Sequence, residues 1–201
     1  MTKGLTLWND FAFEMLRELR GMSPEKRREF WGTPKDRTEF YLALDYGMIP
    51  KVAKRMGMRF VREYMRIDGV LFPENGFPQV FVESENDPTG IADSEIEKLC
   101  YVRAPLKVVV TVSRWPDESR RSRWLQDIKD CQQKWLTESP EVLYGFIIGE
   151  AKREDTGPGK RLGLTFHLFG ASPDGEIVDT RPPEVVGWFP EIPAALAAET
   201  V

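Results

Sequence analysis

Three acidic side chains stand in segments whose other residues favour β-strands. Asp68 lies inside a run of β-branched and aromatic residues, where Asp is uncommon unless a partner compensates for it. Glu83 and Glu85 end another apolar run, and their spacing of two residues places both side chains on one face of a strand. If 69–72 pairs with 79–85 as a hairpin, Asp68 comes close to Glu83 or Glu85. Carboxylates at one end of a sheet repel one another, so this pattern predicts a divalent cation with oxygen ligands, such as Mg²⁺.

The alternative for these acids is an exposed hairpin end, where they would be solvated and bind nothing. Two features of the sequence favour a site. The apolar segment 80–82 places the acids at the mouth of a buried sheet. The segment 86–90 is a loop that leads into a predicted helix, a place where active sites gather in α/β proteins.

Basic side chains that suit nucleic-acid phosphates form two groups. One lies at the start of a predicted helix over 117–136, and the other precedes the first predicted strand. Arginine binds phosphate in a bidentate manner, and several such contacts make affinity fall steeply with salt. A solvated helix face is the alternative for these residues, and Trp115 either packs inward or stacks on a base. The two groups are Arg114, Arg120, Arg121 and Arg123, and Lys51, Lys54 and Arg55.

The composition indicates a globular chain with one sizeable core. The 201 residues are 41% hydrophobic and 30% charged, which excludes a disordered, collagen-like or coiled-coil protein. No apolar run is long enough for a membrane span and the N-terminus has no signal-peptide pattern, so we expect a cytoplasmic protein without a membrane partner. A net charge of −4 argues against non-specific coating of nucleic acid, although residues 68–100 carry 8 acidic and 1 basic residue between more basic segments.

The histidine and cysteine content narrows the chemistry further. His167 is the one histidine, so a histidine-cluster or common zinc site is not expected, and His167 is assigned a structural role. Cys100 and Cys131 are too few for a disulfide framework, and we expect reduced, buried thiols on helices.

Apolar periodicity and turn residues define the expected elements. The first helix should end at Gly21, and a second begins after Ser23; a third begins near Asp36 and breaks at Pro50, with a further turn or two through Met56. The run 58–72 is one bent strand or two joined strands. The other expected strands are 79–85, 106–112, 142–148 and 162–169, and the other expected helices are 93–103, which Asp93 and Ser94 cap, and 117–136.

This order of elements predicts one α/β domain over residues 1–201 with a mixed central sheet. Its parts are N-terminal helices at 1–57, a core at 58–135, C-terminal strands at 136–181 and a surface tail at 182–201. The strands 79–85 and 106–112 should be parallel neighbours, because a connection that contains a helix joins them.

The arrangement of Asp68, a turn, and Glu83-Ser84-Glu85, followed by a helix and a buried strand, resembles the PD-(D/E)xK nuclease superfamily. The resemblance covers roughly residues 36–135, and its motif is short and degenerate. It implies a restriction-endonuclease-like, three-layer fold with an αβββαβ core. It also implies an endonuclease that requires Mg²⁺, for which Mn²⁺ can substitute.

The resemblance implies roles for the matching residues. Asp68 and Glu83 correspond to the metal-binding acids, with the backbone carbonyl of Ser84 as a further ligand. The third motif position is usually lysine and here is Glu85, a departure that a few type II restriction enzymes share. Glu85 would then position or deprotonate the attacking water.

Two positions on helices complete the expected site. Lys98 corresponds to a lysine displaced onto the next helix; its alternative is a helix-surface pair with Glu95 or Asp93. Glu39 is the best match to an acid on the first core helix, and Glu63 and Asp45 are its rivals.

We therefore expect a metal-dependent nuclease that acts on DNA, with RNA as a further candidate substrate and homodimerisation left open. The alternative function is a catalytically silent protein of the same fold that binds nucleic acid or serves as an assembly subunit, which Glu85 in place of lysine favours. A domain without enzymatic function would be indicated if Asp68 and Glu83 were distant from each other.

Overall fold

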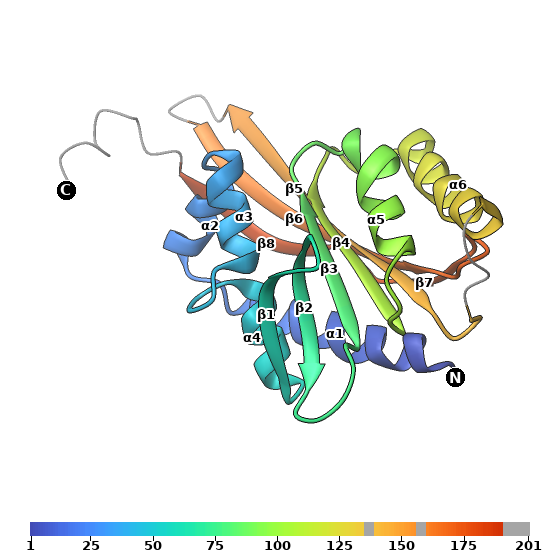
Figure 1. The fold of residues 1–201 in the computed structure, drawn as a ribbon. Helices are drawn as coiled ribbons and strands as arrows, with labels where there is room; N and C mark the ends of the chain where they lie inside the picture. Colours follow the sequence, from blue (N-terminus) through green and yellow to red (C-terminus); the bar gives the residue numbers. More distant parts are fainter. Residues whose placement is uncertain (135–138, 156–159, 191–201) are drawn as a thin grey trace.

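The computed structural model describes residues 1–134, 139–155 and 160–190, and these form an α/β protein with an open, mixed sheet (Figure 1). Eight strands form the sheet: β1 (Met58–Tyr64), β2 (Ile67–Pro73), β3 (Val80–Glu85), β4 (Leu106–Val112), β5 (Leu143–Asp155), β6 (Lys160–Ala171), β7 (Ile177–Thr180) and β8 (Glu184–Pro190). Six α-helices accompany it in the described part of the chain: α1 (Lys3–Arg20), α2 (Pro24–Phe30), α3 (Pro34–Leu42), α4 (Met48–Arg55), α5 (Ile96–Cys100) and α6 (Glu118–Lys134).

The sheet has the strand order β1-β2-β3-β4-β5-β6-β7, and β8 pairs with β6 beside β7. The strands β3, β4 and β5 are parallel, and the other pairs are antiparallel. The predicted parallel pairing of 79–85 with 106–112 is thus confirmed. Because β3, β4 and β5 point the same way, their carboxyl ends form one edge of the sheet.

The two faces of the sheet carry separate hydrophobic cores. Helices α1–α4 pack on one face, against Val80, Val82 and Val108 among others. Helices α5 and α6 cover the other face, where Phe81 and Val109 are buried. Alternate residues of a strand point to opposite faces, so β3 sends Phe81 and then Glu83 towards α5 and α6.

The predicted ends of the N-terminal helices are largely correct. Gly21 ends α1, and the Ser23 hydroxyl accepts a hydrogen bond from the N–H of Lys26 at the start of α2. Helix α3 begins slightly earlier than predicted, because Thr33 and Asp36 form a reciprocal capping box. The predicted break at Pro50 is wrong. Pro50 lies in the first turn of α4, where no backbone donor is needed, and the chain turns before Met48 instead.

The run 58–72 forms two strands rather than one bent strand. β1 and β2 form an antiparallel hairpin, and Met65 and Arg66 make the tight turn with positive φ angles of 55° and 66°. Tyr64 pairs with Ile67 at the closed end of this hairpin. The hairpin therefore places Asp68 near the start of β2, the strand between the edge strand β1 and β3.

Helix α5 differs from its predicted bounds. A π-helical turn, η1 (Ile91–Glu95), precedes it, and the helix ends at Cys100 rather than near Arg103. Asp93 and Ser94 are therefore inside the helical segment instead of capping it. The Ser94 hydroxyl donates to the Gly90 carbonyl at 2.9 Å, a bond back to the preceding turn.

The C-terminal segment is the largest correction to the predicted fold. Residues 182–201 do not form only a surface tail, because β8 (Glu184–Pro190) pairs with β6, and the unpredicted strand β7 pairs with the end of β6. The long strand β6 offers its edge to two short strands in succession, which the proline content of this segment obscured. Residues 135–138, in the predicted helix 117–136, and 191–201 lie outside the described residues.

Candidate functional site

Asp68 and Glu83 lie beside each other at the carboxyl end of β3. The antiparallel register pairs Gly69 with Val82, so the next residues along the two strands are Asp68 and Glu83, with side chains on the same face. The Asp68 Oδ2 accepts a hydrogen bond of 2.8 Å from the N–H of Ser84. The prediction that Asp68 approaches Glu83 or Glu85 is thus confirmed for Glu83, and this bond fixes the Asp68 carboxylate at the strand end.

The Glu83 carboxyl group is buried without a hydrogen-bond donor. Its side chain is 1% exposed, and neither carboxylate oxygen accepts a hydrogen bond from the described residues. Burial first, and then the nearby carboxylates of Asp68 and Glu95, raise the pKa of Glu83 to about 9, because each disfavours a negative charge on this group; the Lys98 ammonium offsets the shift only in part. Once protonated, Glu83 can hydrogen-bond to Asp68, which raises this pKa further. Without a cation, Glu83 therefore holds a proton at neutral pH.

Lys98 provides a positive charge at the same place. Its Nζ lies 3.9 Å from Glu83 Oε1 and donates to both carboxylate oxygens of Glu95 at 2.9 Å. Both predicted placements of Lys98 are thus realised, because the lysine pairs with Glu95 and also approaches Glu83. The Lys98 side chain is 45% exposed, so it bridges solvent and the buried carboxyl group.

Glu95 is the member of this cluster that sequence reasoning assigned only to a surface pair. It is buried, and the Ser94 hydroxyl donates to its Oε1 at 2.8 Å. The sequence signal for its burial was its position directly before Ile96, in a segment whose apolar residues face the core. The acid from the helical layer that raises the pKa of Glu83 is therefore Glu95.

Glu85 takes a different arrangement from that of Glu83. Its Oε1 accepts a hydrogen bond of 2.7 Å from the N–H of Asp87, which ties the side chain to the loop after β3. In the part of the chain that the structure describes, no three His, Cys, Asp or Glu side chains form a group that could hold a metal ion. The predicted convergence of three acids therefore reduces to the Asp68–Glu83 pair, and the role of Glu85 stays a prediction.

The Asp68–Glu83 pair nevertheless fits a hard divalent cation. Mg²⁺ commonly uses one or two carboxylates and completes its shell with waters and substrate phosphates. The unpaired buried oxygens of Glu83 are the observation that supports this fit, since a buried carboxylate requires a cation or a proton. Asp68 and Glu83 would be the ligands.

The predicted helix acid Glu39 is engaged elsewhere. Its carboxylate forms two hydrogen bonds with the Arg62 guanidinium, at 2.8 and 3.1 Å. These bonds raise the pKa of Arg62, and the charges of Glu63 and Asp68 raise it further. Arg62 thus pairs directly with Glu39 and also interacts electrostatically with Asp68. Glu63 and Asp45, the rival acids, are both exposed.

Two of the predicted phosphate-binding arginines lie near the carboxyl edge of the sheet. Arg120 and Arg123 line a pocket of about 300 Å³ together with Pro88 and Thr89, which follow β3. Arg120 also donates to the Ser113 hydroxyl and lies 3.5 Å from Asp117. This pocket therefore lies between the start of α6 and the loop that follows β3.

The other predicted basic residues are more dispersed. Arg121 pairs with Glu118 on the α6 surface, and Arg114 is exposed. Lys54 and Arg55 belong to α4, on the opposite face of the sheet, where Arg55 pairs with Glu14 and Glu18 of α1. The structure therefore separates the two basic groups into different layers.

Trp115 belongs to the core on this face of the sheet, and the half-buried ring of His167 lies beside it, with 6.4 Å between the ring centroids. Trp115 is nearly buried and stacks on Trp124 and Phe169, so it packs inward rather than offering a free face to a base. The Nε2 of His167 lies 3.1 Å from Glu150 Oε2. The inward alternative for Trp115 is thus the correct one.

Comparisons with known proteins add no relative: no protein-family model and no curated protein matches the chain. Among the described residues, every helix is too short or too polar to traverse a lipid bilayer.

Proposed function

We propose that this chain is a Mg²⁺-dependent phosphodiester hydrolase that cleaves DNA. The observation that carries the proposal is the buried Glu83 carboxyl group, which has no hydrogen-bond donor, lies beside Asp68 and is approached by Lys98 at 3.9 Å. Two acids that can hold a divalent ion, with an ammonium group beside them at the carboxyl end of β3, are side chains suited to metal-assisted phosphate hydrolysis.

The order of the central elements supports a restriction-endonuclease-like fold. Helix α4 is followed by β1, β2 and β3, then by α5 and β4, and β3 is parallel to β4. The αβββαβ core of the PD-(D/E)xK superfamily has the same order, and in it Asp68 and Glu83 would take the two acidic positions. The fold assignment at this level is part of the proposal.

The residues of the chain divide the catalytic work. Asp68 and Glu83 would hold Mg²⁺, with the Ser84 carbonyl as a further ligand; the bound ion lowers the pKa of a water and polarises a phosphoryl oxygen. Glu85 would orient that water or accept its proton. Lys98 would face the negative charge that develops on the phosphoryl group, because its Nζ already lies at the Glu83 carboxylate.

Nucleic-acid binding would use the arginine-lined pocket beside these groups. Arg120 and Arg123 can each bind a backbone phosphate with two N–H groups. Their pocket begins three residues after Glu85 in the chain, at Pro88. A strand held there would pass close to the end of β3.

A catalytically silent protein of the same fold is the second candidate. The observation that favours it is the hydrogen bond that holds Glu85 Oε1 on the Asp87 N–H, at the position where the superfamily usually has a free lysine. Such a protein would bind nucleic acid through Arg120 and Arg123 without cutting it.

The deciding experiment is incubation of supercoiled, linear and single-stranded DNA, and of RNA, with the protein and Mg²⁺ or Mn²⁺. We expect cleavage that EDTA abolishes and that Asp68→Ala reduces by about 10³-fold or more, because the change removes a ligand of the catalytic ion. Asp10→Ala, a change of an exposed acid on α1, is the matched control and should cut at the wild-type rate. Metal binding without cleavage of any substrate would support the silent alternative.

A further inference from the structure

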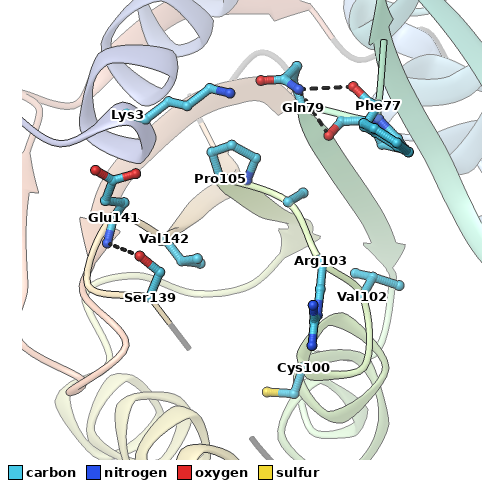
Figure 2. Close-up of a pocket in the computed structure, with 12 residues that line it drawn as sticks. Lys3, Phe77, Gln79, Cys100, Val102, Arg103, Pro105, Ser139, Glu141 and Val142 are labelled. Atoms are coloured by element: carbon cyan, nitrogen blue, oxygen red, sulfur yellow. Dashed lines mark hydrogen bonds between the residues drawn. The ribbon is translucent and has the colours of Figure 1, made fainter. Parts of the chain in front are cut away.

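A cavity of about 600 Å³ opens at the opposite end of the parallel strands from Asp68 and Glu83 (Figure 2). Gln79, Pro105 and Val142, which directly precede β3, β4 and β5, lie along it. The segment after α5 and the first residues of α1 close its sides. Its volume is within the range of small-molecule sites, roughly 300–1,000 Å³.

Two basic side chains in the cavity wall have no partner in the described part of the chain. Lys3 lies at the start of α1, and Arg103 follows α5, so they approach the cavity from different sides. Elsewhere on this protein, basic side chains such as Arg55 and Arg62 pair with glutamates. Lys3 and Arg103 therefore bring two positive charges to a lining whose one carboxylate among the described residues is that of Glu141, and the net positive charge suits an anion.

The backbone of the first turn of α1, from which Lys3 projects, is held by close packing at Gly4. The Gly4 N–H donates to the Glu141 carbonyl at 2.8 Å, which attaches the first turn of α1 to the residues before β5. A Cβ atom on Gly4 would lie 2.4 Å from that carbonyl oxygen and 2.6 Å from the carbonyl oxygen of Pro105. Only glycine permits this approach, so the wall that carries Lys3 is a built part of the fold.

The remaining wall offers an aromatic ring and directed acceptors. Phe77 lines the cavity and is 87% exposed, so its ring is open to a ligand at the cavity rim. The Gln79 amide donates through Nε2 to the Phe77 and Pro78 carbonyls at 2.9 and 3.3 Å, which leaves its Oε1 as an acceptor. The Glu141 carboxylate is a second acceptor in the wall.

We propose that this cavity binds a nucleoside monophosphate, with its phosphate on Arg103 and Lys3 and its base on Phe77. An exocyclic amine of the base would donate to Gln79 Oε1 or Glu141. Phosphate alone would leave Phe77 uncovered, and an uncharged aromatic ligand would leave both cations unpaired. The choice of a nucleoside phosphate over other planar anions rests on the proposed nuclease function, because a nuclease would release nucleotides. The proposal that the cavity binds a planar anion does not depend on that function.

Calorimetric titration in EDTA tests the proposal without any contribution from metal or cleavage. The probes are AMP, CMP, GMP and UMP, with adenosine, inorganic phosphate and a 5′-phosphorylated trinucleotide as comparison ligands. We expect at least one monophosphate to bind at least tenfold more tightly than adenosine or phosphate. Tighter binding of the trinucleotide would identify a strand end, rather than the free nucleotide, as the source of the ligand.

Matched variants locate the binding. Arg103→Ala and Phe77→Ala should each weaken the affinity by about tenfold or more. The controls are Arg28→Ala and Phe13→Ala, which change an exposed arginine and an exposed phenylalanine outside the cavity and should leave the affinity unchanged. Asp68→Ala should bind normally, so a failed nuclease assay and a failed cavity are separate results. Absence of binding by every monophosphate at millimolar concentration, or unchanged affinity in Arg103→Ala and Phe77→Ala, would overturn the proposal.

Discussion

The Nζ of Lys98 lies 3.9 Å from Oε1 of Glu83, although the two side chains come from different layers of the fold. Glu83 belongs to β3 and Lys98 to α5, which packs on that face of the sheet. The third motif position on β3 is Glu85 and carries no positive charge. The ammonium group near Glu83 comes instead from Lys98 on helix α5. Under the proposed nuclease function, this placement would make Lys98 the cation beside the acid pair that faces the substrate phosphate.

Replacement of Lys98 should lower the rate of DNA cleavage without weakening metal binding. Lys98→Ala removes the cation that would face the developing charge, and we expect a loss of roughly 10²-fold in the single-turnover rate. Mn²⁺ affinity should be unchanged or higher, because a competing cation has gone. Lys35→Ala, at an exposed position of α3, is the control. A parallel loss of metal affinity and rate would instead assign Lys98 to the structure of the acid cluster.

The metal-free protein should lose stability as the pH rises through neutrality, and Glu83→Gln should reduce this loss. The pKa of Glu83 is raised from 4.5 to about 9 in the folded chain, so between these values the folded state binds a proton that the unfolded state has released. The free energy of unfolding therefore falls with rising pH across this window, with a limit of about 1.4 kcal/mol per pH unit for one proton.

Urea unfolding in EDTA at several values between pH 5 and pH 9 measures this effect. The free energy of unfolding of Glu83→Gln minus that of the wild type should be smallest near pH 5 and should increase towards pH 9. Glu97→Gln, on the surface of α5, should follow the wild type. Parallel curves for wild type and Glu83→Gln would show that Glu83 is ionised throughout.

Divalent-ion binding should release protons and strengthen with pH. A metal requires ionised carboxylates, so it competes with the proton that burial places on Glu83. Calorimetry with Mn²⁺ in two buffers of different ionisation enthalpy should reveal proton release near pH 7, and Asp68→Ala should abolish the binding. Equal binding by wild type and Asp68→Ala would contradict the assignment of the ligands.

The strands that carry the acids could be predicted because their signals are local. The apolar run 106–112 and the turn before β3 define neighbouring strands, and the helix between them requires a parallel pairing. The turn at Met65 and Arg66 was not predicted, because two ordinary residues adopt positive φ without glycine or asparagine. Local patterns thus located Asp68 and Glu83 without the exact shape of the hairpin.

The parts that could not be predicted depend on contacts between distant segments. Strand β8 exists because β6 extends far enough to pair with it, and its own residues carry no regular alternation. Likewise, the π-helical turn η1 decides that Glu95 is buried beside Glu83, which its spacing from Lys98 alone does not show. Pro50 was misjudged because a proline favours the first turn of a helix as strongly as it disrupts the middle.

Loss of Arg120 and Arg123, which line the pocket at the start of α6, should weaken DNA binding more than loss of an exposed arginine elsewhere on the surface. Arg120→Ala with Arg123→Ala removes the two arginines that would bind backbone phosphates beside the loop after β3. In Ca²⁺, chosen to support binding with little cleavage, we expect a weaker affinity and a salt dependence whose slope falls by about two. Arg28→Ala should leave the slope unchanged, and an unaltered slope in the double variant would remove this pocket from the DNA path.

Glu85 decides between an active nuclease and a silent protein of the same fold. If Glu85 orients the attacking water, Glu85→Gln should keep Mn²⁺ affinity nearly intact and lower the cleavage rate by about 10²–10⁴-fold, the scale of a general base. Glu85→Lys restores the common motif but adds an ammonium group close to a site that already contains Lys98, so we expect it to cut more slowly than the wild type. Single-turnover cleavage and calorimetry on each variant separate the rate from the affinity. A fully active Glu85→Gln would assign the base to another group, and the hydrogen bond from the Asp87 N–H to Glu85 Oε1 would then be the reason that this side chain is held away from the water.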